Sequence, residues 1–266
     1  MTMRDRTEKL KLVFTLAEPT DSTETILGGQ LARIERREGA IAPLVLFDIL
    51  IDRMRVLGIE ASFIDGNRRI SLATTRKRVE RKGSFGEIET TGLVFRYGVV
   101  GSRNHCFISI REKEPNEAGD WDAWTNPFAA LDGFIEGWVV DVEYDNWQNA
   151  EDPLTYEVAG RDYSQLPMKS NDLPFPLEQK IIDTSANPGR WILRDGYVEA
   201  VASLMWLSEL FWRRVGQAHK ARLLSTTGVN VRDYMDGVIE VKASEHCFNS
   251  VETKDAQDRL RASLYG

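Results

Sequence analysis

Basic residues are missing from a long central stretch of this sequence, because no lysine or arginine occurs between residues 114 and 160. This segment, the acidic stretch, holds twelve carboxylates and four of the seven tryptophans. The whole chain has a net charge of -7, so the rest of the sequence is slightly basic. Since the acidic stretch cannot neutralise itself locally, it must face water, a metal ion, basic parts of the same fold or a basic partner.

Cysteines and long apolar runs are also scarce. The two cysteines, Cys106 and Cys247, do not make up the disulfide framework of a small secreted protein, so we expect reduced thiols. No segment has the ~20 apolar residues of a membrane span, and residues 1–12 carry charges where a signal peptide needs an apolar run. These absences predict a soluble cytoplasmic protein with no membrane partner.

The pattern of apolar residues predicts an α+β fold. Alternation in short segments such as 106–111 indicates strands with one polar face, which favours largely antiparallel sheets with packed helices. Pro43 begins an amphipathic helix that Gly58 ends. The class follows from these alternating strands and the helices placed irregularly between them.

Two further segments extend this prediction. Residues 137–144 alternate, which predicts a strand whose acidic face lies in water. Residues 196–215 are apolar on most sides of a helical projection, which predicts a largely buried helix. We favour a single α+β domain over residues 1–266; the alternative is two subdomains that meet near residues 164–178, where prolines indicate irregular structure.

The carboxylates do not have the spacing of a metal site. Segment 141–146 is the nearest match to a calcium loop, but it lacks the turn glycine. The two His-Cys pairs, at 105–106 and 246–247, make poor zinc sites because neighbouring residues on a strand point to opposite faces. There is no G-x-S-x-G nucleophile turn and no phosphate-binding loop. We therefore predict no catalytic residue, no metal and no cofactor.

One short motif supports an enzymatic alternative. Glu240 and Lys242 form an E-x-K pair on a predicted strand, as in restriction-endonuclease-like nucleases that use Mg²⁺. The upstream aspartate of such a site is missing from its expected place, and E-x-K pairs are common on amphipathic strands. A Mg²⁺-dependent nuclease or hydrolase that uses Glu240 and Lys242 is therefore the alternative function.

A second charged cluster, the basic patch, lies between positions 68 and 82. Clustered cations can bind nucleic-acid phosphates, but this cluster has no interleaved aromatic residues and Glu80 interrupts it. We favour an exposed face that pairs with the acidic stretch, and we expect no nucleic-acid partner. The basic patch consists of Arg68, Arg69, Arg76, Lys77, Arg78, Arg81 and Lys82.

Within the acidic stretch, carboxylates flank tryptophans twice, at 120–124 and at 143–147. Carboxylates steer a basic partner and aromatic side chains anchor it, so the two clusters predict a protein-binding surface. In the alternative, the tryptophans are core residues and the acids are only solvated. The predicted partner-binding residues are Asp120, Trp121, Asp122, Trp124, Asp141, Glu143, Asp145, Trp147, Glu151 and Asp152.

The segment 187–207, NPGRWILRDGYVEAVASLMWL, resembles a recurring segment of polymorphic-toxin immunity proteins of the immunity protein 52 family. The resemblance rests chiefly on Gly189-Arg190, on residues 196–200 and 205–207, and on Phe211-Trp212. It implies a cytoplasmic α+β protein encoded beside a toxin with a restriction-endonuclease-like nuclease domain, including toxins delivered by type VI secretion. No toxin-contacting residue is carried over from the family, and the residues of the segment itself fit a structural role.

The resemblance and the charge pattern lead to the same hypothesis. A nuclease binds phosphates through a cationic surface, so an inhibitor that covers this surface benefits from a dense display of carboxylates. We predict an immunity protein that binds and neutralises a cognate secreted toxin stoichiometrically, without turnover. The sequence leaves self-association open.

Overall fold

The computed structural model describes residues 5–18, 21–27, 30–36 and 38–266. Within these residues the largest element is a ten-stranded sheet in which all neighbouring strands are antiparallel. Helices pack on this sheet, so the predicted α+β class with a largely antiparallel sheet is confirmed. The order of the sheet is β15 (Asn230–Met235), β16 (Val238–Lys242), β14 (Leu204–Ser208), β9 (Phe134–Asp141), β1 (Glu8–Thr15), β8 (His105–Glu112), β7 (Leu93–Val100), β6 (Ile88–Thr90), β4 (Phe63–Asp65) and β5 (Arg68–Ile70).

The remaining described elements are short hairpins and helices. The hairpins pair β2 (Asp21–Leu27) with β3 (Gln30–Arg36), β10 (Met168–Ser170) with β11 (Lys180–Ile182), and β12 (Ile192–Arg194) with β13 (Tyr197–Glu199). The helices are α1 (Pro43–Val56), α2 (Leu72–Lys82), α3 (Trp121–Ala129), α4 (Val142–Asn149), α5 (Pro153–Val158), α6 (Glu209–Val215), α7 (Gln217–Leu224), α8 (Lys254–Tyr265), and the 3-10 turns η1 (Gly101–Arg103) and η2 (Val251–Thr253).

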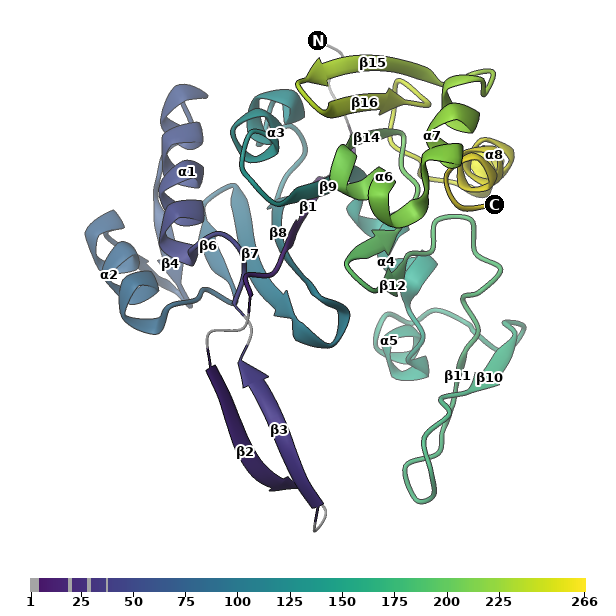
Figure 1. Ribbon diagram of the computed structural model, residues 1–266, viewed down its shortest axis with the longest axis horizontal. Helices are drawn as coiled ribbons and strands as arrows, with labels where there is room; N and C mark the ends of the chain where they lie inside the picture. Colours follow the sequence, from purple (N-terminus) through teal and green to yellow (C-terminus); the bar gives the residue numbers. More distant parts are fainter. Residues whose placement is uncertain (1–4, 19–20, 28–29, 37) are drawn as a thin grey trace.

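Both faces of the sheet are covered, because successive side chains of a strand alternate between its faces. In β1, Leu10, Leu12 and Phe14 pack with helices α1, α2 and α3, whereas Val13 packs with helices α6, α7 and α8. Figure 1 shows the first group of helices on the left of the sheet and the second group on the right. The two groups therefore define two separate hydrophobic clusters among the described residues.

The predicted buried helix over residues 196–215 is wrong. Residues 197–199 form β13, residues 204–208 form β14, and only residues 209–215 form a helix, α6. Strand β14 lies between β9 and β16, with Trp206 in one cluster and Met205 and Leu207 in the other. A central strand that is buried on both faces is apolar throughout, so it resembles a helix that is apolar on all sides.

The predicted strand over residues 137–144 is correct only in its first part. Strand β9 ends at Asp141, and helix α4 begins at Val142. The Asp141 carboxylate accepts a hydrogen bond from the Tyr144 amide at 2.7 Å, which caps the helix. The acidic face expected in water therefore does not exist, and the carboxylates from Asp141 onward follow helical spacing.

The hairpin β10–β11 projects from the body of the protein, toward the bottom of Figure 1. The predicted boundary at residues 164–178 falls in this hairpin and in the loop before it. Below, residues 164–183 are called the arm. The division of the chain into subdomains stays a prediction.

Candidate functional site

The first tryptophan cluster of the acidic stretch belongs to the core. Trp121 and Trp124 on α3 have exposed fractions of 6% and 0%. The Trp124 indole donates to the Ala118 carbonyl at 2.9 Å, and the Trp121 indole donates to the Glu8 carboxylate at 2.6 Å. The prediction that these two tryptophans lie at a binding surface is wrong, because helical spacing directs both at the sheet. Asp120 is exposed, but its carboxylate caps the first turn of α3.

Asp141 and Asp145 are also buried, with exposed fractions of 2% and 6%. The Lys9 and Lys11 ammonium groups lie 2.7 and 3.0 Å from one Asp145 carboxylate oxygen. Burial alone raises the pKa of Asp145, but Lys11 and Lys9 outweigh it and hold the pKa below its usual value. The same burial lowers the pKa of Lys11 to about 8. Asp145 neutralises two lysines of β1, and Asp141 lies 3.4 Å from Arg6 just before that strand. Because both carboxylates are buried, placing them at a binding surface was wrong.

Glu136 is a carboxylate of the acidic stretch that lies in the interior of the sheet. It is fully buried, and one of its oxygens accepts from the Val198 amide at 2.7 Å. Its second oxygen has no hydrogen-bond partner among the described residues. Burial raises the pKa of Glu136 to about 8, more than the Val198 amide and Arg214 lower it. This carboxyl group therefore stays largely protonated near neutral pH.

The second tryptophan cluster, on α4 and α5, lies at the surface. Glu143 is exposed and pairs with Arg161 at 2.9 Å, and the Arg161 guanidinium lies over the Trp147 ring, 4.0 Å from its centre. Trp147 is half-buried and packs on Tyr156. This cluster keeps the combination of carboxylates and an accessible aromatic ring that the sequence predicts.

Glu151 and Asp152 complete the surface cluster. Glu151 pairs with Lys169 of β10 at 2.8 Å, which fastens the arm to the turn between α4 and α5. The exposed Asp152 carboxylate accepts from the Leu154 amide at 2.9 Å and caps α5. Of the ten predicted partner-binding residues, the structure therefore brings four together at one surface: Glu143, Trp147, Glu151 and Asp152.

Asp122 takes part in a different arrangement with the E-x-K motif. Arg232 donates to both oxygens of the buried Glu240 carboxylate, at 2.8 and 2.6 Å, and lies 3.2 Å from Asp122. Burial, with a contribution from Glu240, raises the pKa of Asp122 to about 6. The Lys242 ammonium binds Glu245 at 2.7 Å instead of facing this cluster. The Arg232 guanidinium thus neutralises the carboxylates that a Mg²⁺ ion would need.

The basic patch does not pair with the acidic stretch. Arg76 binds Asp48 of α1 at 2.8 Å, and Arg78 binds Asp65 at 2.6 Å. Among the ion pairs of the described residues, none joins the basic patch to residues 114–160. The predicted internal pairing is therefore wrong: the acidic stretch finds its cations in β1, at Arg6 before it, in β15 and around the arm.

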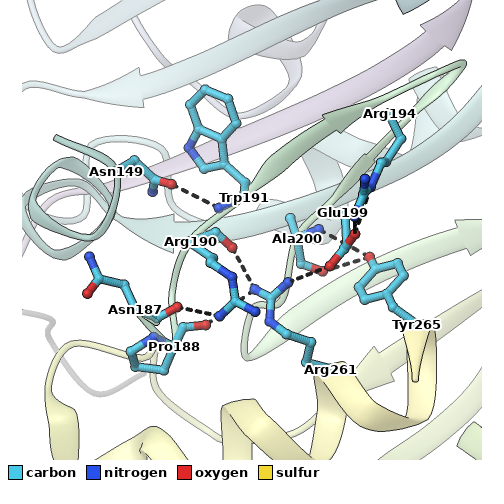
Figure 2. Close-up of polar contacts among 10 residues, drawn as sticks. All are labelled: Asn149, Asn187, Pro188, Arg190, Trp191, Arg194, Glu199, Ala200, Arg261 and Tyr265. Carbon is cyan, nitrogen blue, oxygen red and sulfur yellow. Dashed lines mark hydrogen bonds and ion pairs between the residues drawn. The ribbon is translucent and has the colours of Figure 1, made fainter. Parts of the chain in front are cut away.

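The segment that carries the family resemblance is bound by side chains of α8 (Figure 2). Arg261 of α8 donates to the backbone carbonyls of Pro188 and Arg190 and to the Glu199 carboxylate. The Tyr265 hydroxyl exchanges hydrogen bonds with the backbone of Ala200. These contacts indicate a structural role for the segment.

The arm carries apolar side chains that sequence reasoning missed. Phe175 at its tip is 90% exposed. The chain around it contains prolines and no helical or strand period, so only the irregular structure was predicted. The available signal was the mixture of large apolar residues with prolines, since no amphipathic element could bury them. The exposed apolar residues of α5 and the arm are Leu154, Val158, Leu166, Met168, Leu173, Phe175 and Leu177.

The described residues contain no group of three or more His, Cys, Asp or Glu side chains that could hold a metal ion. None of the described helices is both long enough and apolar enough to cross a membrane. No family model, curated protein or solved structure matches this chain.

Proposed function

We propose that this protein is an immunity protein that binds a cognate secreted antibacterial toxin and neutralises it stoichiometrically, without turnover. The toxin is a restriction-endonuclease-like nuclease, as the resemblance of residues 187–207 implies. The surface formed by α4, α5 and the arm contacts it. The acidic stretch contributes Glu143, Trp147, Glu151 and Asp152 to this surface.

One observation carries the proposal. Asp152 and Glu157 are exposed carboxylates that lack a lysine or arginine partner within the described chain. They lie at and on α5, which also carries exposed apolar side chains. On α5, Leu154 and Val158 are 58% and 82% exposed, and they lie one helical turn apart on one face. Glu157, beside them in sequence, is exposed as well. Apolar anchors with a polar, charged rim are the usual composition of a protein interface.

The hydrolase alternative has weaker support. It needs Glu240 and Lys242 to face a common metal site, whereas Glu240 binds Arg232 and Lys242 binds Glu245. Incubation of the purified protein with DNA and RNA in Mg²⁺ or Mn²⁺ should leave both intact. Cleavage that is lost in Lys242→Ala would favour the alternative.

Co-expression tests the proposal directly. The toxic domain encoded by the neighbouring gene is expressed in a sensitive bacterium with and without this protein. We expect growth to be restored and the two proteins to elute as a complex of equal stoichiometry. Growth arrest that persists although both proteins are present in soluble form would contradict the proposal.

A further inference from the structure

The arm ends in a loop, residues 173–177, whose apolar side chains are not buried by the rest of the described chain. Leu173, Phe175 and Leu177 are 50%, 90% and 60% exposed, and Pro174 and Pro176 separate them. Exposed apolar residues on a protein surface are ordinary when they occur singly. Three of them at the end of one projecting hairpin form an exposed apolar patch, which is typical of a surface that binds another molecule. Below, residues 173–177 are called the tip.

The tip has a defined shape because Asn171 forms hydrogen bonds with the backbone on both sides of the loop. The Asn171 side-chain oxygen accepts from the amides of Leu173 and Gln179, at 3.2 and 3.0 Å. Its side-chain nitrogen donates to the Leu177 carbonyl at 3.0 Å, and its backbone amide donates to the Gln179 carbonyl at 3.0 Å. Pro174 and Pro176 restrict the backbone further. Much of the ordering that binding would require is therefore complete in the free protein.

The base of the arm is fixed to the body of the protein. Ile182 of β11 is buried with Ala150 and Tyr156. Its amide donates to the Glu151 carbonyl at 2.8 Å, and the Glu151 carboxylate binds Lys169 of β10. A fixed base with an apolar end is suited to enter a concave surface, since a flat surface would leave the sides of the hairpin uncovered.

The charges around the arm identify the kind of surface that accepts it. Residues 150–183 carry seven carboxylates and three cations. Arg161 and Lys169 already pair with carboxylates within this segment or with Glu143. In the described chain, five of the carboxylates have no lysine or arginine partner, and these are Asp152, Glu157, Asp162, Asp172 and Glu178.

This excess of negative charge discriminates among the possible binding partners of the tip. A second copy of the chain would bring like charges together, and an anionic bilayer would repel them. A protein surface rimmed by lysine and arginine would attract them and speed the encounter. We propose that the tip inserts into an apolar pocket of a partner protein whose rim is basic. The inference rests on the proposed function, in which this partner is the toxin.

Binding of the catalytically inactivated toxic domain to single variants tests the insertion. A central aromatic anchor is a typical hot spot, so Phe175→Ser should raise the Kd about 30-fold or more. Asn171→Ala, which loosens the tip without removing an anchor, should raise it about 5-fold. The matched control is Val56→Ser, because Val56 is an apolar residue of α1 with an exposed fraction of 66%. This control should bind as the unchanged protein does.

The outcomes separate the two proposals. If the unchanged protein does not bind the toxic domain, the proposed function fails and this inference fails with it. If it binds but Phe175→Ser binds equally well, the function stands and the inference is overturned. Variants that lose binding must also keep the unfolding midpoint of the unchanged protein in urea, which the exposure of Phe175 leads us to expect.

Two further measurements test the other possible binding partners of the tip, a second copy of the chain and a lipid surface. Light scattering over a range of concentrations should report a monomer, and a dimer that Phe175→Ser abolishes would assign the tip to a second copy. Sedimentation with vesicles of phosphatidylcholine and phosphatidylglycerol should leave the protein in solution. Binding to these vesicles that depends on Phe175 would assign the tip to a lipid surface and overturn the inference.

Discussion

The two tryptophan clusters of the acidic stretch have similar compositions and opposite positions in the fold. Around α3, Trp121 and Trp124 are buried and their indoles donate to internal acceptors. Around α4 and α5, Trp147 is only half-buried and lies under the exposed Arg161. The difference teaches that composition identifies an acidic, aromatic segment but does not decide which side of it faces water. Helix register and the presence of a covering sheet decide that.

The carboxylates differ in the same way. Asp145 and Glu136 are inside the protein, where one is held by two lysines and the other remains largely protonated. Glu143 and Asp152 are outside. A change at an inner carboxylate should therefore alter folding, and a change at the outer Glu143 should alter mainly association.

The largest effect is expected from removing the charge of Asp145. In Asp145→Asn, Lys9 and Lys11 would stay in a mostly buried position without their partner, which costs roughly 3–5 kcal/mol of unfolding free energy for a broken buried pair. Urea denaturation followed by tryptophan fluorescence measures this. The outer control is Glu143→Gln, which should change the unfolding free energy by less than about 1 kcal/mol. Equal changes in the unfolding free energy of the two variants would contradict the distinction between buried and exposed carboxylates.

Glu136 should make the free energy of unfolding decrease as the pH rises. Its pKa rises from 4.5 to about 8 on folding, so the folded protein binds more protons than the unfolded chain between these values. This contribution is fully present below about pH 4.5 and is lost as the pH rises through about 8.

Glu136→Gln keeps an oxygen for the Val198 amide and removes the titration. The unfolding free energy of the variant minus that of the unchanged protein should therefore grow by a few kcal/mol between pH 5 and pH 8. Chemical denaturation at several pH values gives this difference. A difference that stays constant over this range would mean that Glu136 titrates normally in the fold.

The sequence was sufficient for the parts of the fold that have regular periods. Helix α1 and strand β8 follow the predicted segments, because amphipathic spacing and alternation each match one kind of element. It was not sufficient for β14, where burial on both faces removes the alternation. The start of α4 at Val142 also escaped prediction, because Asp141 acts as a helix cap and not as an outward-facing strand residue.

The candidate surface was predictable only in part, for a related reason. Glu143 and Asp152 are exposed as expected, whereas the positions of Asp141 and Asp145 depend on pairing between β1 and β9 and on the lysines that β1 presents to α4. The arm could be identified as irregular but not as projecting. Whether another element covers an apolar loop depends on long-range packing that no local pattern encodes.

A smaller effect is expected from reversing charges at the rim of the candidate surface. Glu157→Lys combined with Glu178→Lys should weaken toxin binding about 5-fold at low salt, and the loss should shrink as salt rises. The matched control is Asp132→Lys, an exposed residue of the same acidic stretch that lies just before β9, at the opposite end of that strand from α4. Titration calorimetry at two salt concentrations provides the comparison. Equal losses in the rim variant and in the control would indicate a general charge effect.

The smallest effect is expected on the stability of the arm variants. Because Phe175 is 90% exposed, Phe175→Ser should change the unfolding free energy by less than about 0.5 kcal/mol. Trp124→Ala, at a fully buried tryptophan of the other cluster, should lower it by roughly 3–5 kcal/mol. Thermal denaturation of the two variants side by side checks the contrast. A large destabilisation in Phe175→Ser would mean that the tip packs on the protein itself.

Hydrogen exchange of the protein with and without the inactivated toxic domain tests the central claim most directly. The account predicts slower exchange on binding in α5 and in the arm, above all at residues 173–177, and no change in α3 around Trp124. Slower exchange confined to the basic patch on β5 and α2, or to any surface that excludes both α5 and the arm, would contradict it.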